Sequence, residues 1–345
     1  MVASENDSKH TNQARRMQES ADPPFETTYK RLLEKVMSAP EVSGVGECEL
    51  PMIDLNELKM GELSKRACKK KIALASQEWG FFQVINHGIC GEVLEKMREE
   101  QAKLFAKPFS DKAAYNFSSG SYRWGTPSAT CLAQLSWSEA FHVSVSDLLA
   151  SPNTHNNLSS IMGQYARMVS ELSQKLVDIL ASELGQKSDF FKENCVESTC
   201  YLRLNRYPAC PILPQMFGIM PHTDSDFVTV LHQDQIGGLQ LVKDGTWFAV
   251  KPNPQALVIN IGDLFQAWSN NVYKSVEHRV VANPVYERFS TAYFFCPSYD
   301  TVIASGIDTC VYRSFTFGEY RKQVQQDVKF FGHKIGLPRF LLQTH

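Results

Sequence analysis

The second half of the chain, from Thr199 onward, alternates short β-branched and aromatic segments with turns rich in Gly, Pro, Asn and Asp. Segments of this length between such turns predict antiparallel strands rather than helices. A long series of them is typical of a sandwich or jelly roll, so we expect a mainly β fold with flanking α-helices. The predicted strands are 199–205, 227–231, 239–242, 247–250, 256–261, 276–281 and 290–295.

The first half of the chain contains helical patterns. Apolar residues recur every three or four positions from Leu158 to Leu180, which predicts one buried stripe on a long helix that ends at Gly185. Shorter helices are expected at 64–79, before Gly80, and at 91–106, before Lys107-Pro108. Two short strands are expected at 50–55 and 81–86. We assign these elements to supporting the β-sheet rather than to chemistry.

A chain of 345 residues can bury a large core within one unit. Residues 1–46 are polar and without sustained periodicity, which predicts a flexible tail or a loosely attached helix with no catalytic role. The remaining segments are an N-terminal region of helices and strands that packs on the core, the catalytic core itself and a C-terminal helical extension. We place them at 47–195, 196–300 and 301–345.

Charge and cysteine content restrict the partners and the compartment. A net charge of -2 provides no basic field for nucleic acid or an anionic membrane, so a small molecule is the expected partner. Nine cysteines without a Cys-X-X-Cys pair indicate reduced thiols rather than a zinc ribbon or a disulfide framework. The sequence shows neither a secretory signal pattern nor a membrane-length apolar run, which predicts a soluble cytoplasmic protein, with a nuclear location left open.

Two His-X-Asp triplets compete as candidate metal-binding motifs. His222-Thr223-Asp224 follows a loop that contains Pro221 and precedes the strand 227–231, whereas His232-Gln233-Asp234 lies at the far end of that strand. Residues two apart in an extended segment point to the same face, so His222 and Asp224 can meet one metal. This position favours the first triplet, and we interpret His232 as a histidine at a strand end.

A third ligand, His278, would have to come from a distant strand. Two imidazoles and one carboxylate on one face of a metal leave open positions, which suits the non-haem Fe(II) oxygenases, whereas structural zinc sites are closed by four ligands. His87, beside Gly88 at the end of the strand 81–86, is a further possible ligand. We interpret it as a structural hydrogen-bonding residue.

These residues resemble a known family, the plant-type 2-oxoglutarate and Fe(II)-dependent dioxygenases, whose core is a double-stranded β-helix, or jelly roll. The resemblance covers residues 50–335. The motifs that carry it are Glu78 to Gly88, Asn205-Arg206-Tyr207-Pro208, the metal triad, Gly237-Gly238-Leu239-Gln240 and Arg288-Phe289-Ser290. By this resemblance His222, Asp224 and His278 bind Fe(II), O2 is the second co-substrate, and ascorbate serves as reductant.

The same resemblance implies a site for 2-oxoglutarate. Arg288 would bind the distal carboxylate through its planar fork of donors, and Ser290 would add a hydroxyl group. Tyr207 would contact the same carboxylate, and Asn205 would line the same pocket. Family members often have tyrosine where Arg206 stands, but residue 206 is expected to point to the opposite face. Oxidative decarboxylation to succinate and carbon dioxide would accompany hydroxylation of the substrate.

The substrate is inferred from another segment. Residues 122–127 and 134–142 resemble the signature of gibberellin 2-oxidases that act on twenty-carbon gibberellins, which would inactivate the hormone pathway by hydroxylation at carbon 2. Arg123 between Tyr122 and Trp124 would suit a carboxylate among aromatic rings, so these three are candidate substrate contacts. Alternatively, Trp124 and Trp137 only pack the segment against the barrel.

Two other functions remain open at this point. One is an oxygenase of the same fold that acts on a flavonoid or another specialised metabolite. The other is a non-catalytic metal-binding protein of this fold, which the presence of Tyr207, Arg288 and Ser290 disfavours. The sequence does not predict the oligomeric state.

Overall fold

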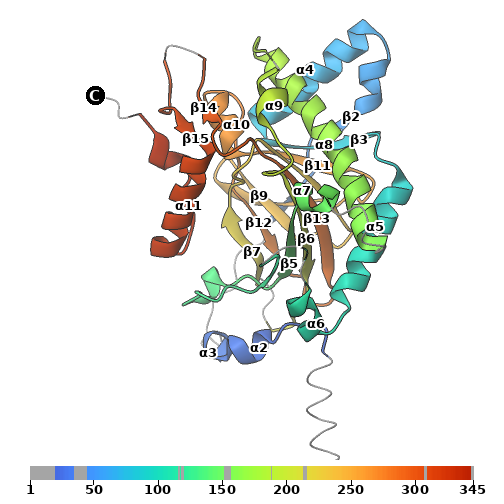
Figure 1. Ribbon diagram of the computed structural model, residues 1–345, viewed down its shortest axis with the longest axis vertical. Coiled ribbons are helices and arrows are strands. Elements are labelled where there is room, and N and C mark those ends of the chain that lie inside the picture. Colours follow the sequence, from blue (N-terminus) through green and yellow to red (C-terminus); the bar gives the residue numbers. More distant parts are fainter. Residues whose placement is uncertain are drawn as a thin grey trace, which may run out of the picture.

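The structure is a computed structural model that describes residues 20–34, 45–115, 117, 120–150, 157–187, 189–212, 216–306 and 309–342. Its β-strands occupy the centre of the molecule (Figure 1). Helices α5 (Gly91–Phe105) and α8 (Asn157–Glu183) lie on one side of the strands, and α11 (Phe317–Phe331) lies on the other.

The larger sheet has eight strands in the order β2-β3-β11-β8-β13-β6-β5-β4. Neighbouring strands are antiparallel except β2 and β3, which are parallel. Successive side chains of a strand alternate between the inside of the sandwich and the helical layer. The strands are β2 (Met52–Asp54), β3 (Phe81–Ile85), β4 (Tyr122–Trp124), β5 (Glu139–Ser144), β6 (Tyr201–Tyr207), β8 (Val228–Gln233), β11 (Leu257–Ile261) and β13 (Arg288–Phe295).

The smaller sheet has five strands in the order β1-β10-β9-β12-β7. They are β1 (Gly46–Cys48), β7 (Phe217–His222), β9 (Leu239–Lys243), β10 (Thr246–Val250) and β12 (His278–Val281). Apolar side chains from both sheets, among them Phe81, Leu241 and Val258, form a buried cluster between them. A short pair, β14 (Val302–Ile303) and β15 (Phe315–Thr316), precedes α11.

Helices cover the outer face of the larger sheet. The stripe predicted on α8 is buried, and α4 (Glu62–Glu78) and α5 pack against this helix. Gly80 and Gly185, the two predicted stops, adopt positive φ angles of 63° and 69°. The other helices are α2 (Phe25–Thr28), α3 (Lys30–Leu33), α6 (Phe109–Ala114), α7 (Val145–Ala150), α9 (Asp189–Asn194), α10 (Asp263–Trp268), η2 (Leu55–Lys59), η3 (Leu132–Gln134) and η4 (Leu337–Phe340).

The predicted fold class is confirmed, and each of the seven strands predicted after residue 199 is present with ends shifted by a few residues. The sequence patterns missed β1, β4, β5, β7, β14 and β15. In β7, Gly218 and Pro221 resemble loop residues, but this strand lies at an edge of its sheet, where proline is tolerated. Pro221 therefore belongs to a strand rather than to the loop we expected.

The N-terminal segment is more ordered than the predicted tail where it is described. Phe25 of α2 is buried and stacks on Trp137 with 4.4 Å between ring centroids, and the Tyr29 hydroxyl accepts a hydrogen bond from the Thr126 backbone. Two aromatic residues four apart provide enough apolar surface to dock an otherwise polar segment. Residues 1–19 and 35–44 lie outside the described residues.

The region 47–195 contributes four strands, β2 to β5, to the same sheet as β6, β8, β11 and β13. It therefore completes the core sheet in addition to packing helices on it. Among the described helices, none combines the length and apolar character required to cross a membrane.

Candidate metal and oxoacid site

Three side chains converge at one end of the space between the sheets. His222 is the last residue of β7, and His278, the first residue of β12, lies directly opposite it in the antiparallel register. Asp224 follows two residues after His222, with its Oδ1 3.6 Å from His222 Nε2 and its Oδ2 3.8 Å from His278 Nε2. The ligand atoms of all three lie within 4.8 Å of one another. The structure thus brings together the three residues predicted to bind metal.

Hydrogen bonds orient these side chains. The Nδ1 atoms of His222 and His278 lie 2.8 Å and 3.1 Å from the carbonyl oxygens of Met220 and Val276. A proton on each Nδ1 can be donated to its carbonyl, which leaves both Nε2 lone pairs directed at a common point. Two polar side chains that the sequence analysis missed, Thr229 and Asn260, donate to Asp224 Oδ2 at 2.6 Å and 2.7 Å.

The electrostatics favour the protonation states that a metal requires. Burial, together with the neighbouring His278, lowers the pKa of His222 to about 3, so its imidazole is neutral at neutral pH. Burial opposes ionisation of Asp224, but the two histidines and the hydrogen bonds from Thr229 and Asn260 outweigh it and lower the pKa of Asp224 to about 2. Neutral imidazoles and an ionised carboxylate are the metal-binding forms.

Arg288 is a buried cation that lines the same cavity as the triad, with only 1% of its surface exposed. Its NH2 group donates to Gln233 Oε1 at 2.7 Å, and its guanidinium lies 4.8 Å from the centre of the Tyr207 ring. No carboxylate among the described residues forms an ion pair with it, and its Nε atom has no hydrogen-bond partner there. A buried charge without a counter-ion is costly, so this site suits an acidic ligand.

The other residues predicted to bind the oxoacid surround Arg288. Tyr207 is directly opposite Arg288 in the β6–β13 register, and Asn205 is opposite Ser290. Asn205 Nδ2 donates to Ser290 Oγ at 3.3 Å. Gly218 makes room for this arrangement, because a Cβ atom there would lie 2.4 Å from Tyr207 Cδ1. Gln233 was missed, although its position two residues after Leu231 in β8 predicts that it faces inward.

The four predicted oxoacid residues, Asn205, Tyr207, Arg288 and Ser290, line a cavity of about 500 Å³ that continues from the metal triad to α11. Of the three predicted substrate contacts, Arg123 lines it, whereas Tyr122 and Trp124 do not. The reason is strand alternation: Arg123 faces the cavity, and its neighbours on β4 face the helical layer. On that side Trp124 packs against Phe25, which agrees with the alternative that this tryptophan only packs its segment against the barrel.

Arg206 faces that helical side, as expected. It donates to Glu139 at 2.8 Å, and the same buried carboxylate accepts from Lys112 at 2.7 Å and from the Tyr122 hydroxyl. Arg206 also reaches Asp22 and Glu287. The network joins β4, β5 and β6 on the side opposite the cavity. It therefore supports the sheet without contributing to the site.

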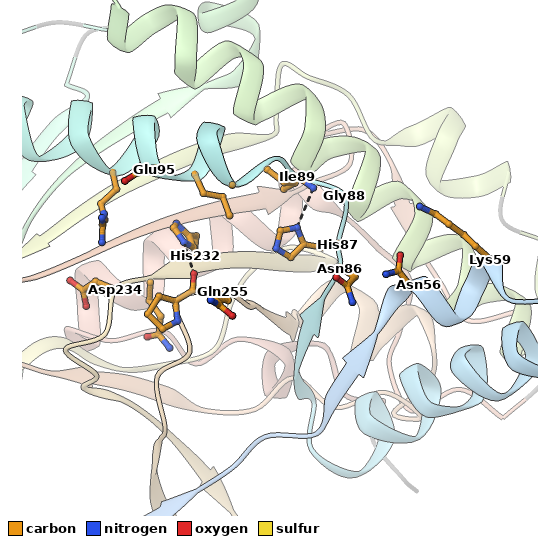
Figure 2. Close-up of a pocket in the computed structure, with 15 residues that line it drawn as sticks. Asn56, Lys59, Asn86, His87, Gly88, Ile89, Glu95, His232, Asp234 and Gln255 are labelled. Carbon is orange, nitrogen blue, oxygen red and sulfur yellow. Dashed lines mark hydrogen bonds between the residues drawn. The ribbon is translucent and has the colours of Figure 1, made fainter.

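The two remaining candidate histidines lie in a separate pocket of about 790 Å³ (Figure 2). His87 Nδ1 accepts from the Ile89 backbone at 3.2 Å, and His232 Nε2 lies 3.3 Å from the Pro254 carbonyl oxygen. Neither histidine belongs to a cluster of three metal-binding side chains within the described ranges. Both histidines thus make backbone contacts, which agrees with a structural role, and that interpretation stays a prediction.

Comparisons with known proteins agree with this geometry. Residues 198–297 match the model of the 2OG-Fe(II) oxygenase superfamily, and residues 50–160 match that of the non-haem dioxygenase in morphine synthesis N-terminal region. The chain is 58% identical over 334 residues to gibberellin 2-beta-dioxygenase 8 of Arabidopsis thaliana, covering 93% of this chain and 98% of that one. It is 49% identical to gibberellin 2-beta-dioxygenase 6 of Oryza sativa subsp. japonica, covering 92% and 96%.

Among solved structures, JOX2 in complex with 2OG, Fe and JA is similar, with a TM-score of 0.68 and 30% identity over 88% of this chain and 94% of that one. The donor set of two imidazoles and one carboxylate fits Fe(II), and the unpaired Arg288 fits a dicarboxylic co-substrate. The chain therefore belongs to the 2OG-Fe(II) oxygenase superfamily and is an Fe(II)- and 2-oxoglutarate-dependent dioxygenase with a double-stranded β-helix core.

Proposed function

We propose that this enzyme hydroxylates a gibberellin at carbon 2 and that its preferred substrate is a twenty-carbon gibberellin. The observation that carries the proposal is the 58% identity, along almost the whole chain, to a protein named for gibberellin 2-beta-dioxygenase activity. The product would be a hydroxylated gibberellin with lower hormone activity. A cytoplasmic or nuclear location is part of the same proposal.

In this function His222, Asp224 and His278 hold Fe(II), and Arg288, Ser290 and Tyr207 hold the distal carboxylate of 2-oxoglutarate. Asn205 positions the Ser290 hydroxyl through its side-chain amide. Gln233 holds one arm of the Arg288 guanidinium, which restricts the remaining donors to the cavity side. Each ligand-binding group is thus oriented by a neighbour before the ligand arrives, which lowers the entropic cost of binding.

When bound, the iron, 2-oxoglutarate and O2 supply the oxidising chemistry that converts a C–H bond to C–OH, with release of succinate and carbon dioxide. The protein positions the substrate and keeps water away from the reacting carbon. Phe81, Ile219 and Leu239 line the cavity beside the triad, and Val324 and Val328 of α11 line it as well. Such apolar walls suit a rigid diterpenoid skeleton and exclude water from the reacting carbon.

The test is turnover of purified protein with Fe(II), ascorbate, 2-oxoglutarate and a panel of nineteen- and twenty-carbon gibberellins, with products identified by mass spectrometry. We expect addition of one oxygen at carbon 2 of a twenty-carbon member, and succinate in equal amount. If a flavonoid in the same panel gained oxygen and no gibberellin did, the substrate assignment would be wrong and the enzyme class would stand. Iron binding without any succinate formation would favour the non-catalytic alternative.

A further inference from the structure

Three arginines line the cavity without a role in binding iron or 2-oxoglutarate: Arg123 on β4, Arg203 on β6 and Arg321 on α11. Among the described residues, none of them forms an ion pair with a carboxylate. The contrast with Arg206, on the other face of β6, is clear, because that side chain reaches Asp22, Glu139 and Glu287. Besides these three and Arg288, Lys334 also lines the cavity, but it is paired with Asp263 at 2.8 Å.

The strand register places two of these arginines beyond the oxoacid site. Arg123 on β4 pairs with Ala140 on β5, and Ala140 pairs with Asn205 on β6. Asn205 in turn pairs with Ser290 on β13. Three strand spacings correspond to about 15 Å between the backbones of Arg123 and Ser290. Arg203 lies between them, two residues before Asn205 on the same face of β6. These side chains are therefore available to a substrate and not to the carboxylate that Arg288 binds.

Arg321 approaches from the opposite side. It precedes Val324 and Val328 by one and two turns on α11, and all three line the cavity. The three arginines converge around His142, whose ring stacks on Tyr201 at 4.0 Å. Burial together with the positive charges of Arg203, Arg123 and Arg321 lowers the pKa of His142 to about 3. The cluster of positive charge thus includes residues from three separate elements.

Arg203 is already oriented. Its Nε atom donates to Asn205 Oδ1 at 2.8 Å, so its terminal nitrogens are the groups that can meet a ligand. Asn205 also contacts Ser290, which connects the arginine cluster to the oxoacid site through one amide. A planar guanidinium held in this way is suited to a carboxylate.

Three cations in one cavity repel one another unless anions neutralise them. The open, dicarboxylic twenty-carbon gibberellins carry two free carboxylates, whereas nineteen-carbon gibberellins carry one and close the other as a lactone. We propose that Arg123, Arg203 and Arg321 together bind the two carboxylates of a dicarboxylic twenty-carbon gibberellin and thereby discriminate against the lactones. This inference rests on the proposed function and names the residues that would set its selectivity.

The experiment replaces each arginine singly by glutamine and measures two quantities for a dicarboxylic twenty-carbon gibberellin and for a nineteen-carbon lactone. The first is kcat/KM. The second is the Kd of each gibberellin for the protein loaded with 2-oxoglutarate and with Mn(II) in place of Fe(II), which binds substrate without turnover. We expect the Kd for the dicarboxylic acid to rise about 10- to 100-fold in each variant, as for a lost hydrogen bond to a charged group. In at least one variant the preference over the lactone should fall about tenfold or more.

Lys322→Gln is the matched control, because Lys322 is exposed on the same helix turn as Arg321 and does not line the cavity. Arg203→Lys keeps the charge and should retain part of the preference. An unchanged thermal midpoint shows that each variant is folded; the KM for 2-oxoglutarate is not used for this purpose, because Arg203 contacts Asn205 of the oxoacid site. The inference is overturned if all three variants keep the wild-type preference within twofold, or if Lys322→Gln lowers it equally. If wild-type enzyme oxidises no gibberellin, the proposed function fails and this inference fails with it.

Discussion

The triplets His222-Thr223-Asp224 and His232-Gln233-Asp234 lie ten residues apart and differ only in their middle residue, yet they have different roles in the fold. In the first, β7 ends at His222, and Asp224 in the following loop meets both histidines. In the second, β8 continues through His232 and Gln233 between β11 and β13. The first His-X-Asp motif can therefore form a three-ligand cluster because a strand ends within it and His278 lies opposite.

Continuation of β8 separates the three residues of the second triplet. His232 faces the outer pocket, Gln233 faces inward to Arg288, and Asp234 accepts hydrogen bonds from the backbone of Ile236 and Phe289. Because successive residues of a strand point to opposite faces, no single ion can reach His232 and the inward-facing groups together. The middle residue of the second triplet, and not its histidine, contacts a residue of the ligand cavity, Arg288.

The largest difference between the triplets should appear when the same change is made at the third residue of each. Asp224→Asn removes the anionic ligand, so we expect iron affinity and turnover to fall by about three orders of magnitude, equivalent to about 4 kcal/mol. Iron binding is measured by metal titration and turnover by succinate release. Asp234→Asn is the matched control: it should leave iron affinity within about threefold while lowering the thermal midpoint, because it weakens two backbone contacts. Equal loss of iron in both variants would contradict the comparison.

A smaller effect is expected at the middle residues. Gln233→Leu removes the acceptor of the buried Arg288 NH2 group, so the KM for 2-oxoglutarate should rise about 10-fold or more, as for a hydrogen bond to a charged group. Gln233→Glu should raise this KM further, because the new carboxylate pairs with Arg288 and competes with the co-substrate.

Thr223→Val is the corresponding control in the first triplet, since the Thr223 hydroxyl donates to Asp263 rather than to a ligand-binding group. Its KM for 2-oxoglutarate should change less than threefold. The role of Gln233 would be refuted if Gln233→Leu bound 2-oxoglutarate as tightly as wild type in an anaerobic titration.

The smallest effect is expected at the second histidine. His232 makes one long hydrogen bond to Pro254 and lines a pocket that the metal triad does not share. His232→Gln should therefore change the free energy of unfolding by less than about 1 kcal/mol and leave iron affinity and kcat unchanged. Denaturant unfolding measures the free energy of unfolding, metal titration the iron affinity and succinate release the kcat. A large loss of iron in this variant would mean that position in the strand does not separate the two triplets.

Strand alternation explains which parts of the site could be predicted from the sequence. On β6, Asn205 and Tyr207 are two positions apart, and on the neighbouring strand β13 Arg288 and Ser290 have the same spacing. The members of each pair therefore share the inner face. The same rule, applied to residues 122–124, would have separated Arg123 from Tyr122 and Trp124. The pattern of these three residues does not by itself identify β4 as a strand, because the segment is too short to show alternation.

Other contacts could not be predicted because they join elements that are distant in the sequence. Arg321 lies on α11 and reaches the cavity only through the packing of this helix near the triad. Thr229 and Asn260 contact Asp224 because β8 and β11 are neighbours in the sheet. Phe25 and Tyr29 stand in a polar segment, where local patterns do not reveal docking against Trp124 and Trp137.

The sequence by itself determined the fold class, the long helix and the set of candidate metal ligands, because local side-chain patterns and turn residues are encoded over a few positions. Only the tertiary structure decided which His-X-Asp triplet ends a strand opposite His278, which cations remain unpaired in the cavity and that Gln233 supports Arg288. These properties depend on strand neighbours and on burial, which arise when segments far apart in the chain pack together.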